Sequence, residues 1–167
     1  MPYQSFEDLP VWQAAIELAL RVYNLTEDPA FRESGDLPDQ LRRASLSVSN
    51  NIAEGFERGT TPERLMFLYI ARGSAGETRS QLRFCLRRPR FVHLKAEILE
   101  TIPLAESCSR QLHGWTESLQ NSDIKGQRHL NDQVRESFTA KRRSDAFLEK
   151  LRALNTHLHP QPDAPNT

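Results

Sequence analysis

Four arginines of the predicted third helix, residues 61–88, have a spacing that suits phosphate binding. They are Arg72, Arg79, Arg83 and Arg87, which lie seven, four and four residues apart. At 100° per residue these positions fall within an arc of about 80° on one side of a helix. Guanidinium groups pair with phosphate oxygens, and aligned like charges repel each other when no anion separates them. This arginine strip therefore predicts a surface for RNA or another nucleic acid.

The arginine strip also has a structural interpretation. Long arginine side chains commonly lie along apolar surface and pair with carboxylates of adjacent helices. Glu54, Glu57 and Glu77 are candidate partners for such pairs. Contact with an acidic protein is a third interpretation. The three differ in the source of the neutralising anion, which the sequence does not identify.

Further basic residues flank the strip. From Arg79 to Lys95 the chain contains five arginines and one lysine and no acidic residue. Clustered positive charge of this kind attracts polyanions, so we include Arg88 and Arg90 in the predicted nucleic-acid-binding set. Arg43, in the predicted second helix, is a weaker candidate that would extend the patch.

Three polar residues interrupt the small-residue segment SLSVSNNIAEGFERGTT, residues 45–61. Asn50, Asn51 and Glu54 could form a catalytic site, a hydrogen-bonded contact or a solvated face. Asn50 and Glu54 lie nearly opposite the apolar side of the predicted helix, and Glu54 precedes Arg58 by four residues, the spacing of a helical ion pair. Two amides and one carboxylate supply neither a nucleophile nor a metal-ligand set. We therefore predict that these residues contact another helix or subunit.

Catalytic and metal-binding motifs are missing from the sequence. There is no HExxH or GxSxG motif, and none of the five histidines follows a glutamate by three residues, as di-iron bundles require. We expect no catalytic residue, no metal site and no cofactor, so the protein is predicted not to be an enzyme.

A small-residue patch, Gly73 to Gly76, lies inside the predicted third helix. Each glycine costs a helix about 1 kcal/mol relative to alanine. Close approach of another helix is the expected compensation. No strand precedes the patch and no lysine follows it, so it is not a phosphate loop.

Apolar residues recur at three- and four-residue intervals, as in amphipathic helices. Prolines follow helix-start signals at Pro10, Pro38 and Pro62, with Asp8, Asp36 and Thr61 as predicted caps. Pro103 should kink or split the last helix. The predicted helices cover about residues 10–27, 37–59, 61–88 and 91–119.

Four such helices joined by short turns predict an all-α fold, an antiparallel up-down four-helix bundle over residues 1–120. Residues 121–167 are polar and are predicted to be a C-terminal appendage. Within it, residues 144–155 are compatible with a short helix, and the proline-rich end is predicted to be disordered.

The bulk composition is neutral, because Lys+Arg and Asp+Glu both total 22. The distribution of charge, rather than its sum, must therefore indicate any partner.

Cys85 and Cys108 lack the spacing of metal or redox sites, and we interpret them as reduced, packed thiols. Without an apolar leader or a spanning segment of about 18 residues, the chain is predicted to be cytoplasmic.

Three segments resemble the four-helix-bundle family named after proteins encoded in intervening sequences of bacterial 23S ribosomal RNA. They are FEDLPVWQAAIELALRVYNLT, LPDQLRRASLSVSNNIAEGFERGT and FLYIARGSAGETRSQL. The resemblance covers about residues 5–119 and implies a bundle that assembles into a homopentameric barrel. It also implies a relation to the accessory variability protein of diversity-generating retroelements, a basic pentamer that binds nucleic acid and a reverse transcriptase. Carried over, Arg79, Arg83 and Arg87 would be the basic surface.

Two functions follow as hypotheses. The first is a non-enzymatic oligomeric scaffold that binds RNA or a nucleic-acid complex, such as one containing a reverse transcriptase, through the arginine strip. The alternative is a protein–protein interaction adaptor without nucleic-acid binding, in which internal carboxylates satisfy the arginines. In that case the partner would meet the appendage or the end of the barrel.

Overall fold

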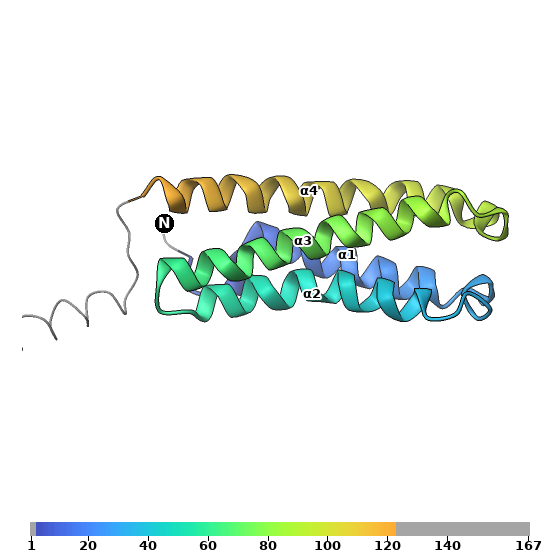
Figure 1. Cartoon of the computed structure of the whole chain (residues 1–167), viewed down its shortest axis with the longest axis horizontal. Helices are drawn as coiled ribbons and strands as arrows, with labels where there is room; N and C mark the ends of the chain where they lie inside the picture. Colours follow the sequence, from blue (N-terminus) through green and yellow to red (C-terminus); the bar gives the residue numbers. More distant parts are fainter. Residues whose placement is uncertain (1–2, 123–167) are drawn as a thin grey trace, which may run out of the picture. The chain divides into compact units, whose positions relative to one another are not determined.

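A computed structural model describes residues 3–122, and all regular structure in that range is helical. The predicted all-α four-helix fold is confirmed, with consecutive long helices running in opposite directions (Figure 1). Three short 3₁₀ helices accompany the long ones. In chain order the elements are η1 (Phe6–Asp8), α1 (Pro10–Thr26), η2 (Pro29–Phe31), α2 (Leu37–Glu57), α3 (Thr61–Cys85), η3 (Pro89–Leu94) and α4 (Lys95–Gln120).

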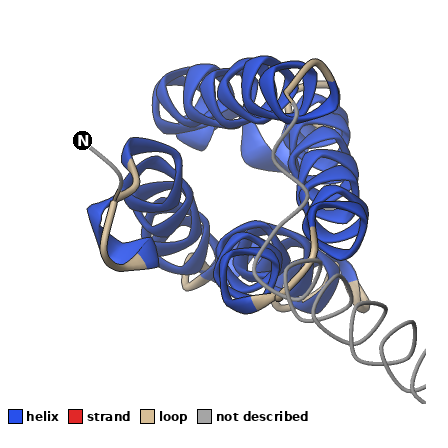
Figure 2. Cartoon of the chain, turned by 90° about the vertical axis from the view of Figure 1, so that its left-hand side faces the viewer, coloured by secondary structure: helices blue, strands red, loops and turns tan. Residues whose placement is uncertain are grey.

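Each long helix packs against the helix that follows it, and α4 returns to pack against α1. Viewed end-on, the four helices occupy the corners of a closed bundle (Figure 2). The α1–α2 and α3–α4 connections lie at one end, and the α2–α3 turn lies at the other (Figure 1). Among the described helices, none is long and apolar enough to cross a membrane.

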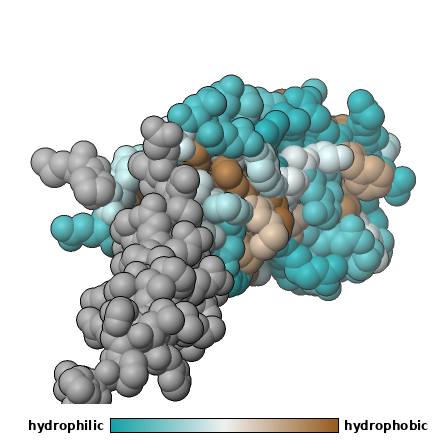
Figure 3. Space-filling model, turned by 60° about the vertical axis from the view of Figure 1, so that its left-hand side comes forward, coloured by the Kyte–Doolittle hydropathy of each residue, from teal (hydrophilic) through white to brown (hydrophobic). Residues whose placement is uncertain are grey.

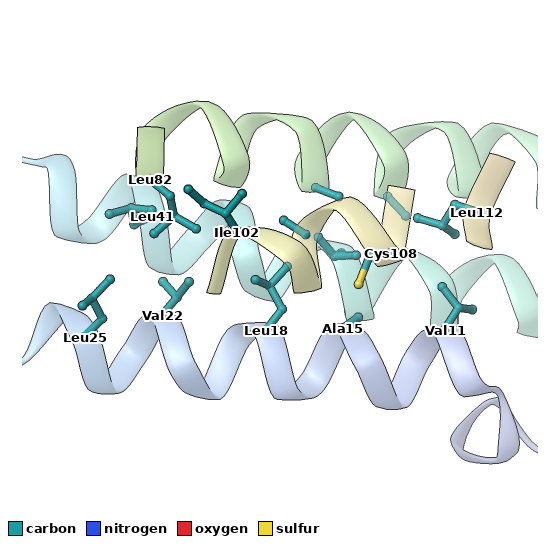
Figure 4. Packing of buried hydrophobic residues seen from close by; sticks show 14 of the residues in the cluster. Val11, Ala15, Leu18, Val22, Leu25, Leu41, Leu82, Ile102, Cys108 and Leu112 are labelled. Atoms are coloured by element: carbon teal, nitrogen blue, oxygen red, sulfur yellow. The ribbon is translucent and has the colours of Figure 1, made fainter. Parts of the chain in front are cut away.

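The core is built from the apolar side of every helix. Along α1, the side chains of Val11, Leu18 and Val22 point toward the other three helices (Figure 4). They belong to one buried cluster with Leu82 of α3 and Leu112 of α4, both fully buried. The apolar side of α2 faces the core, because its residues are buried except for the partly buried Phe56: Leu41, Ala44, Ser45, Val48, Ile52, Gly55 and Phe56.

The helix starts differ in detail from the predicted caps. The hydroxyl of Thr60, rather than that of Thr61, accepts a hydrogen bond from the backbone N–H of Glu63 and so caps α3. Asp8 belongs to a capping box with Ser5 that starts η1, and the backbone of Leu9 occupies the cap position of α1. Asp36 is the cap residue of α2 but makes no side-chain cap bond.

Pro103 does not split the last helix, contrary to one of the predicted outcomes, because α4 is continuous from Lys95 to Gln120. Proline removes one backbone donor and leaves the carbonyl four residues earlier without its helical partner. Both Pro103 and Leu99, the residue that carries that carbonyl, are exposed. Water can therefore satisfy the carbonyl.

At the end of the bundle that holds the α1–α2 and α3–α4 connections, η3 contacts η2 and the residues on either side of η2. The rings of Phe31 and Phe91 lie 4.6 Å apart. Arg90 donates to the Glu33 carboxylate at 2.8 Å, and Nε2 of His93 lies 3.1 Å from the Asp28 carboxylate. The backbone N–H of Ala30, with His93, holds the pKa of Asp28 below its usual value.

The predicted appendage, residues 121–167, lies almost entirely outside the described range, as does its predicted helix at 144–155. These two assignments stay predictions.

Candidate nucleic-acid interface

Side chains of α3 and α4 line an open groove of about 680 Å³. Because the two helices are antiparallel and adjacent, residues far apart in sequence meet along it. We call it the basic groove, and its lining residues are Tyr69, Arg72, Gly73, Gly76, Arg79, Glu106, Ser109, Arg110 and His113.

Two of the four residues of the arginine strip belong to the wall of the basic groove. Arg72 and Arg79 line the groove directly, and Arg83 contacts the same α4 carboxylate as Arg79. The side chains of Arg79 and Arg83 are 44% and 57% exposed, so both can reach a ligand. Arg87 is exposed just beyond the end of α3, and its side chain has no ion pair within residues 3–122.

Glu106 of α4 supplies the carboxylate that faces the strip. Its Oε1 accepts a hydrogen bond from Arg83 at 3.1 Å and lies 3.9 Å from Nη1 of Arg79. The structural interpretation of the arginines therefore has the right chemistry but named the wrong partners. Glu54 pairs with Arg58, Glu77 accepts from Gln81, and no ion pair of Glu57 is present in the described range.

Positive charge remains in excess in the basic groove. Three arginines line it, and Glu106 is the only acidic residue among the described lining residues. Arg72 donates to Nδ1 of His113 at 3.4 Å, and an imidazole nitrogen that accepts a hydrogen bond does not neutralise the charge of the arginine. Arg110 is exposed and has no ion pair with any described residue. One carboxylate cannot neutralise this set, so an added anion is favoured there.

Gly73 and Gly76 form bare helix surface within the basic groove. A Cβ atom added at either position would meet no atom within 4 Å. Within residues 3–122, the expected close approach of another helix is therefore wrong for these two glycines, whereas Ser74 between them does contact Ser47 of α2. Gly55 of α2 makes such an approach instead, because an added Cβ would lie 3.1 Å from Cβ of Phe67 on α3.

The other predicted basic residues do not line the groove. The guanidinium of Arg88 lies 5.9 Å from the ring centroid of Phe84, and Arg90 is bound to Glu33 and Ser34 at the end of the bundle. Arg43 is exposed on α2 and has no ion pair in the described range. A role for these three in binding stays a prediction.

Asn50, Asn51 and Glu54 occupy three different environments. Asn51 donates to the Ser47 carbonyl at 2.7 Å and to its hydroxyl at 3.0 Å. That hydroxyl lies 2.9 Å from the hydroxyl of Ser74 on α3, so Asn51 supports a polar link between α2 and α3. Asn50 is exposed, and Glu54 pairs with Arg58 as their spacing predicts. Contact with another subunit is untested.

Sequence reasoning missed the contribution of α4 to the groove. Glu106, Arg110 and His113 are four and three residues apart and so share one side of α4. The same helical spacing that identified the arginine strip would have grouped them. What the spacing could not give was which side of α4 faces α3.

The described residues contain no group of three His, Cys, Asp or Glu side chains that could hold a metal ion. Burial raises the pKa of Cys85 and of Cys108 to about 11, so neither thiol is an activated nucleophile. The functional groups that do gather at one place in the described chain are the arginine side chains of the basic groove, which donate hydrogen bonds and carry positive charge.

Most of the described chain matches a known protein family. A search of curated proteins found none similar to this chain. A family model described as 23S rRNA-intervening sequence protein matches residues 7–114, which is more than half of the chain and includes all four long helices in whole or in part. The chain therefore belongs to the 23S rRNA-intervening sequence protein family.

Proposed function

We propose that this protein is a non-catalytic, oligomeric scaffold that binds RNA through the basic groove and the arginine strip. The observation that carries the proposal is the charge imbalance of the groove, where Arg72, Arg79 and Arg110 face the single carboxylate of Glu106. Phosphate oxygens accept from guanidinium groups in the same paired geometry as carboxylates do. The family's name refers to 23S rRNA, which makes ribosomal RNA the first RNA to test.

The length of the strip suits a strand of nucleic acid. Fifteen residues separate Arg72 from Arg87, which corresponds to about 22 Å along a helix at 1.5 Å per residue. Phosphates of one stacked strand repeat about every 3.4 Å along its axis. The four arginines of the strip are thus spread over a length of about six phosphates, and one subunit would contact several of them.

Oligomerisation is the second part of the proposal. Leu20 and Tyr23 of α1 are 55% and 40% exposed, and Arg42 of α2 lies over the Tyr23 ring. Leu46, one turn after Arg42, is 37% exposed. We call Leu20, Tyr23 and Leu46 the α1–α2 patch. Figure 3 shows one face of the bundle on which apolar patches interrupt a hydrophilic surface.

A second apolar surface lies on α3. Met66, Ile70 and Phe84 are 52%, 45% and 50% exposed and fall within an arc of about 40° on the helix. Two different apolar faces suit a ring, in which one face of each subunit packs against the other face of the next. They support the homopentameric barrel that the sequence resemblance implies. In a ring the basic grooves would repeat around the assembly.

A protein partner is part of the same proposal. The resemblance to accessory proteins of diversity-generating retroelements makes a reverse transcriptase the first candidate. The setting we propose is cytoplasmic, where two unpaired buried cysteines stay reduced.

The test is retention of a 23S rRNA hairpin with a single-stranded tail, measured by fluorescence anisotropy. Arg79→Glu plus Arg83→Glu should abolish binding in a variant that keeps its helical content and mass. The matched control, Arg21→Glu plus Arg32→Glu, changes the net charge equally on residues outside the groove and should retain binding. Electrostatic contact through four arginines predicts a slope of about −3 for log affinity against log salt.

A second variant, Glu106→Gln, tests whether Glu106 competes with the RNA for the arginines. It removes the carboxylate that competes with phosphate for Arg79 and Arg83. Exposed ion pairs contribute about 1 kcal/mol or less, so the affinity should rise by up to about fivefold. Glu100→Gln, on α4 but paired with Arg21, should leave it unchanged. Binding that survives both charge reversals in the strip would contradict the proposal.

The adaptor hypothesis predicts the opposite pattern. A protein would co-purify without nucleic-acid absorbance, and reversing the strip would leave that association intact.

A further inference from the structure

The basic groove contains aromatic rings as well as arginines. Tyr69 is 41% exposed and lines the groove from α3. The His113 side chain, 55% exposed, lines it from α4. An arginine strip alone would suit any polyanion. Rings beside the arginines add a surface on which a nucleobase can stack.

Both rings are held at their edges. Oη of Tyr69 accepts a hydrogen bond from Nε2 of Gln120 at 2.6 Å. His113 accepts from Arg72 through Nδ1, and its Nε2 lies 3.9 Å from Glu117. Neither ring has an aromatic or cation–π partner among the described residues. The polar atoms are therefore anchored while the ring faces lack a stacking partner.

Bare backbone lies beside the rings and the arginines. Gly73 and Gly76 line the groove and have open space where a Cβ would stand. A side chain at either position would occupy the groove. Because both positions lack a side chain, a flat group can approach the surface of α3 closely.

We infer that the basic groove seats one unpaired nucleotide. Its base would stack on Tyr69 or His113 above Gly73 and Gly76, and its phosphate would bind Arg79 and Arg110. The inference rests on the proposed nucleic-acid binding and narrows it to single strands. Bases of a duplex are stacked on each other and hide their faces, so a duplex could use only the arginines.

The test compares three labelled probes with the full chain at one salt concentration: oligouridylate, oligothymidylate and a blunt RNA duplex of equal length. Both single strands should bind about tenfold or more tightly than the duplex. Tyr69→Ala should weaken single-strand binding about fivefold or more, the loss of one stacking contact. Tyr69→Phe should retain it, as should the control Tyr3→Ala, which changes a tyrosine that is 52% exposed and lies outside both the groove and the two apolar faces.

A second variant keeps the inference testable. Gly76→Ala should fold at least as stably as the wild type, because its Cβ would enter open space. It should weaken binding of the single strands and leave duplex binding unchanged.

Two results would overturn the inference and leave the proposed function intact. One is equal affinity for single strands and duplex, with all binding lost in Arg79→Glu plus Arg83→Glu. The other is single-strand binding that neither Tyr69→Ala nor Gly76→Ala changes. If none of the three probes binds at low salt, both the proposed function and this inference fail.

Discussion

Cys85 and Cys108 lie fully buried in the core, on α3 and α4. Burial disfavours the charged thiolate and raises the pKa of both thiols from 9.0 to about 11. The thiolate is the reactive form. A chromogenic disulfide reagent at pH 8 should therefore react slowly with the native protein, and with both thiols at once in urea.

The same pKa shift gives stability a dependence on alkaline pH. A raised native pKa favours the protonated native state, so this contribution is present below pH 9.0 and is lost as the pH rises toward 11. Melting temperatures measured across that range should fall.

Rapid labelling of both thiols in the folded protein at pH 8 would contradict the packing described for this core.

Individual residues of the groove were predictable to different degrees. The arginine strip could be read from sequence because helical spacing fixes which residues share a side. Glu106 could not be assigned to Arg83 from sequence, because the pairing depends on the axial position of α4 relative to α3. Arg90 illustrates the same limit, since its partner Glu33 is 57 residues away.

At the scale of one helix, glycines separate close packing from open surface. Gly55→Ala should destabilise the bundle, because the added Cβ would meet Cβ of Phe67 at 3.1 Å and the Arg64 carbonyl at 3.3 Å. Neither atom can rotate away, so a cost of roughly 1–3 kcal/mol is expected. Urea-unfolding midpoints measure it.

Gly114→Ala on α4 is the matched control. Gly114 is exposed, and its added Cβ would meet nothing within 4 Å. Helix propensity alone then applies and should stabilise the protein by up to about 1 kcal/mol. A midpoint that falls for Gly114→Ala as much as for Gly55→Ala would show that the α2–α3 approach is not the cause.

The elements themselves follow closely from the sequence. Apolar periodicity identified all four long helices, because each buries one side against the core. The ends were less predictable around Pro89, where α3 stops at Cys85 and residues 89–94 form a 3₁₀ helix before α4. That stretch buries Phe91 and Leu94, a tertiary requirement that local propensity does not express.

For the whole molecule, the two apolar faces predict an assembly. Light scattering of the wild type should give five times the chain mass of 19.2 kDa. Leu46→Glu places a charge in the α1–α2 patch and should reduce the mass without unfolding the helices, because Leu46 is already 37% exposed. Val92→Glu, at a residue 71% exposed in η3, should leave the mass unchanged. A wild-type monomer would refute the ring.

The contacts between η2 and η3 also bear on how the bundle moves. The N-terminal end of α4 follows directly from η3, which is held by Phe31, Glu33 and Asp28. Toward the C-terminal end of α4, two exposed hydrogen bonds join it to α3 across the groove, from Gln120 to Tyr69 and from Arg72 to His113. Thermal opening of α4 should therefore begin at its C-terminal turns, and amide exchange there should be fastest. The basic groove would then widen at its end beside Tyr69, while α4 stays attached to the bundle at η3.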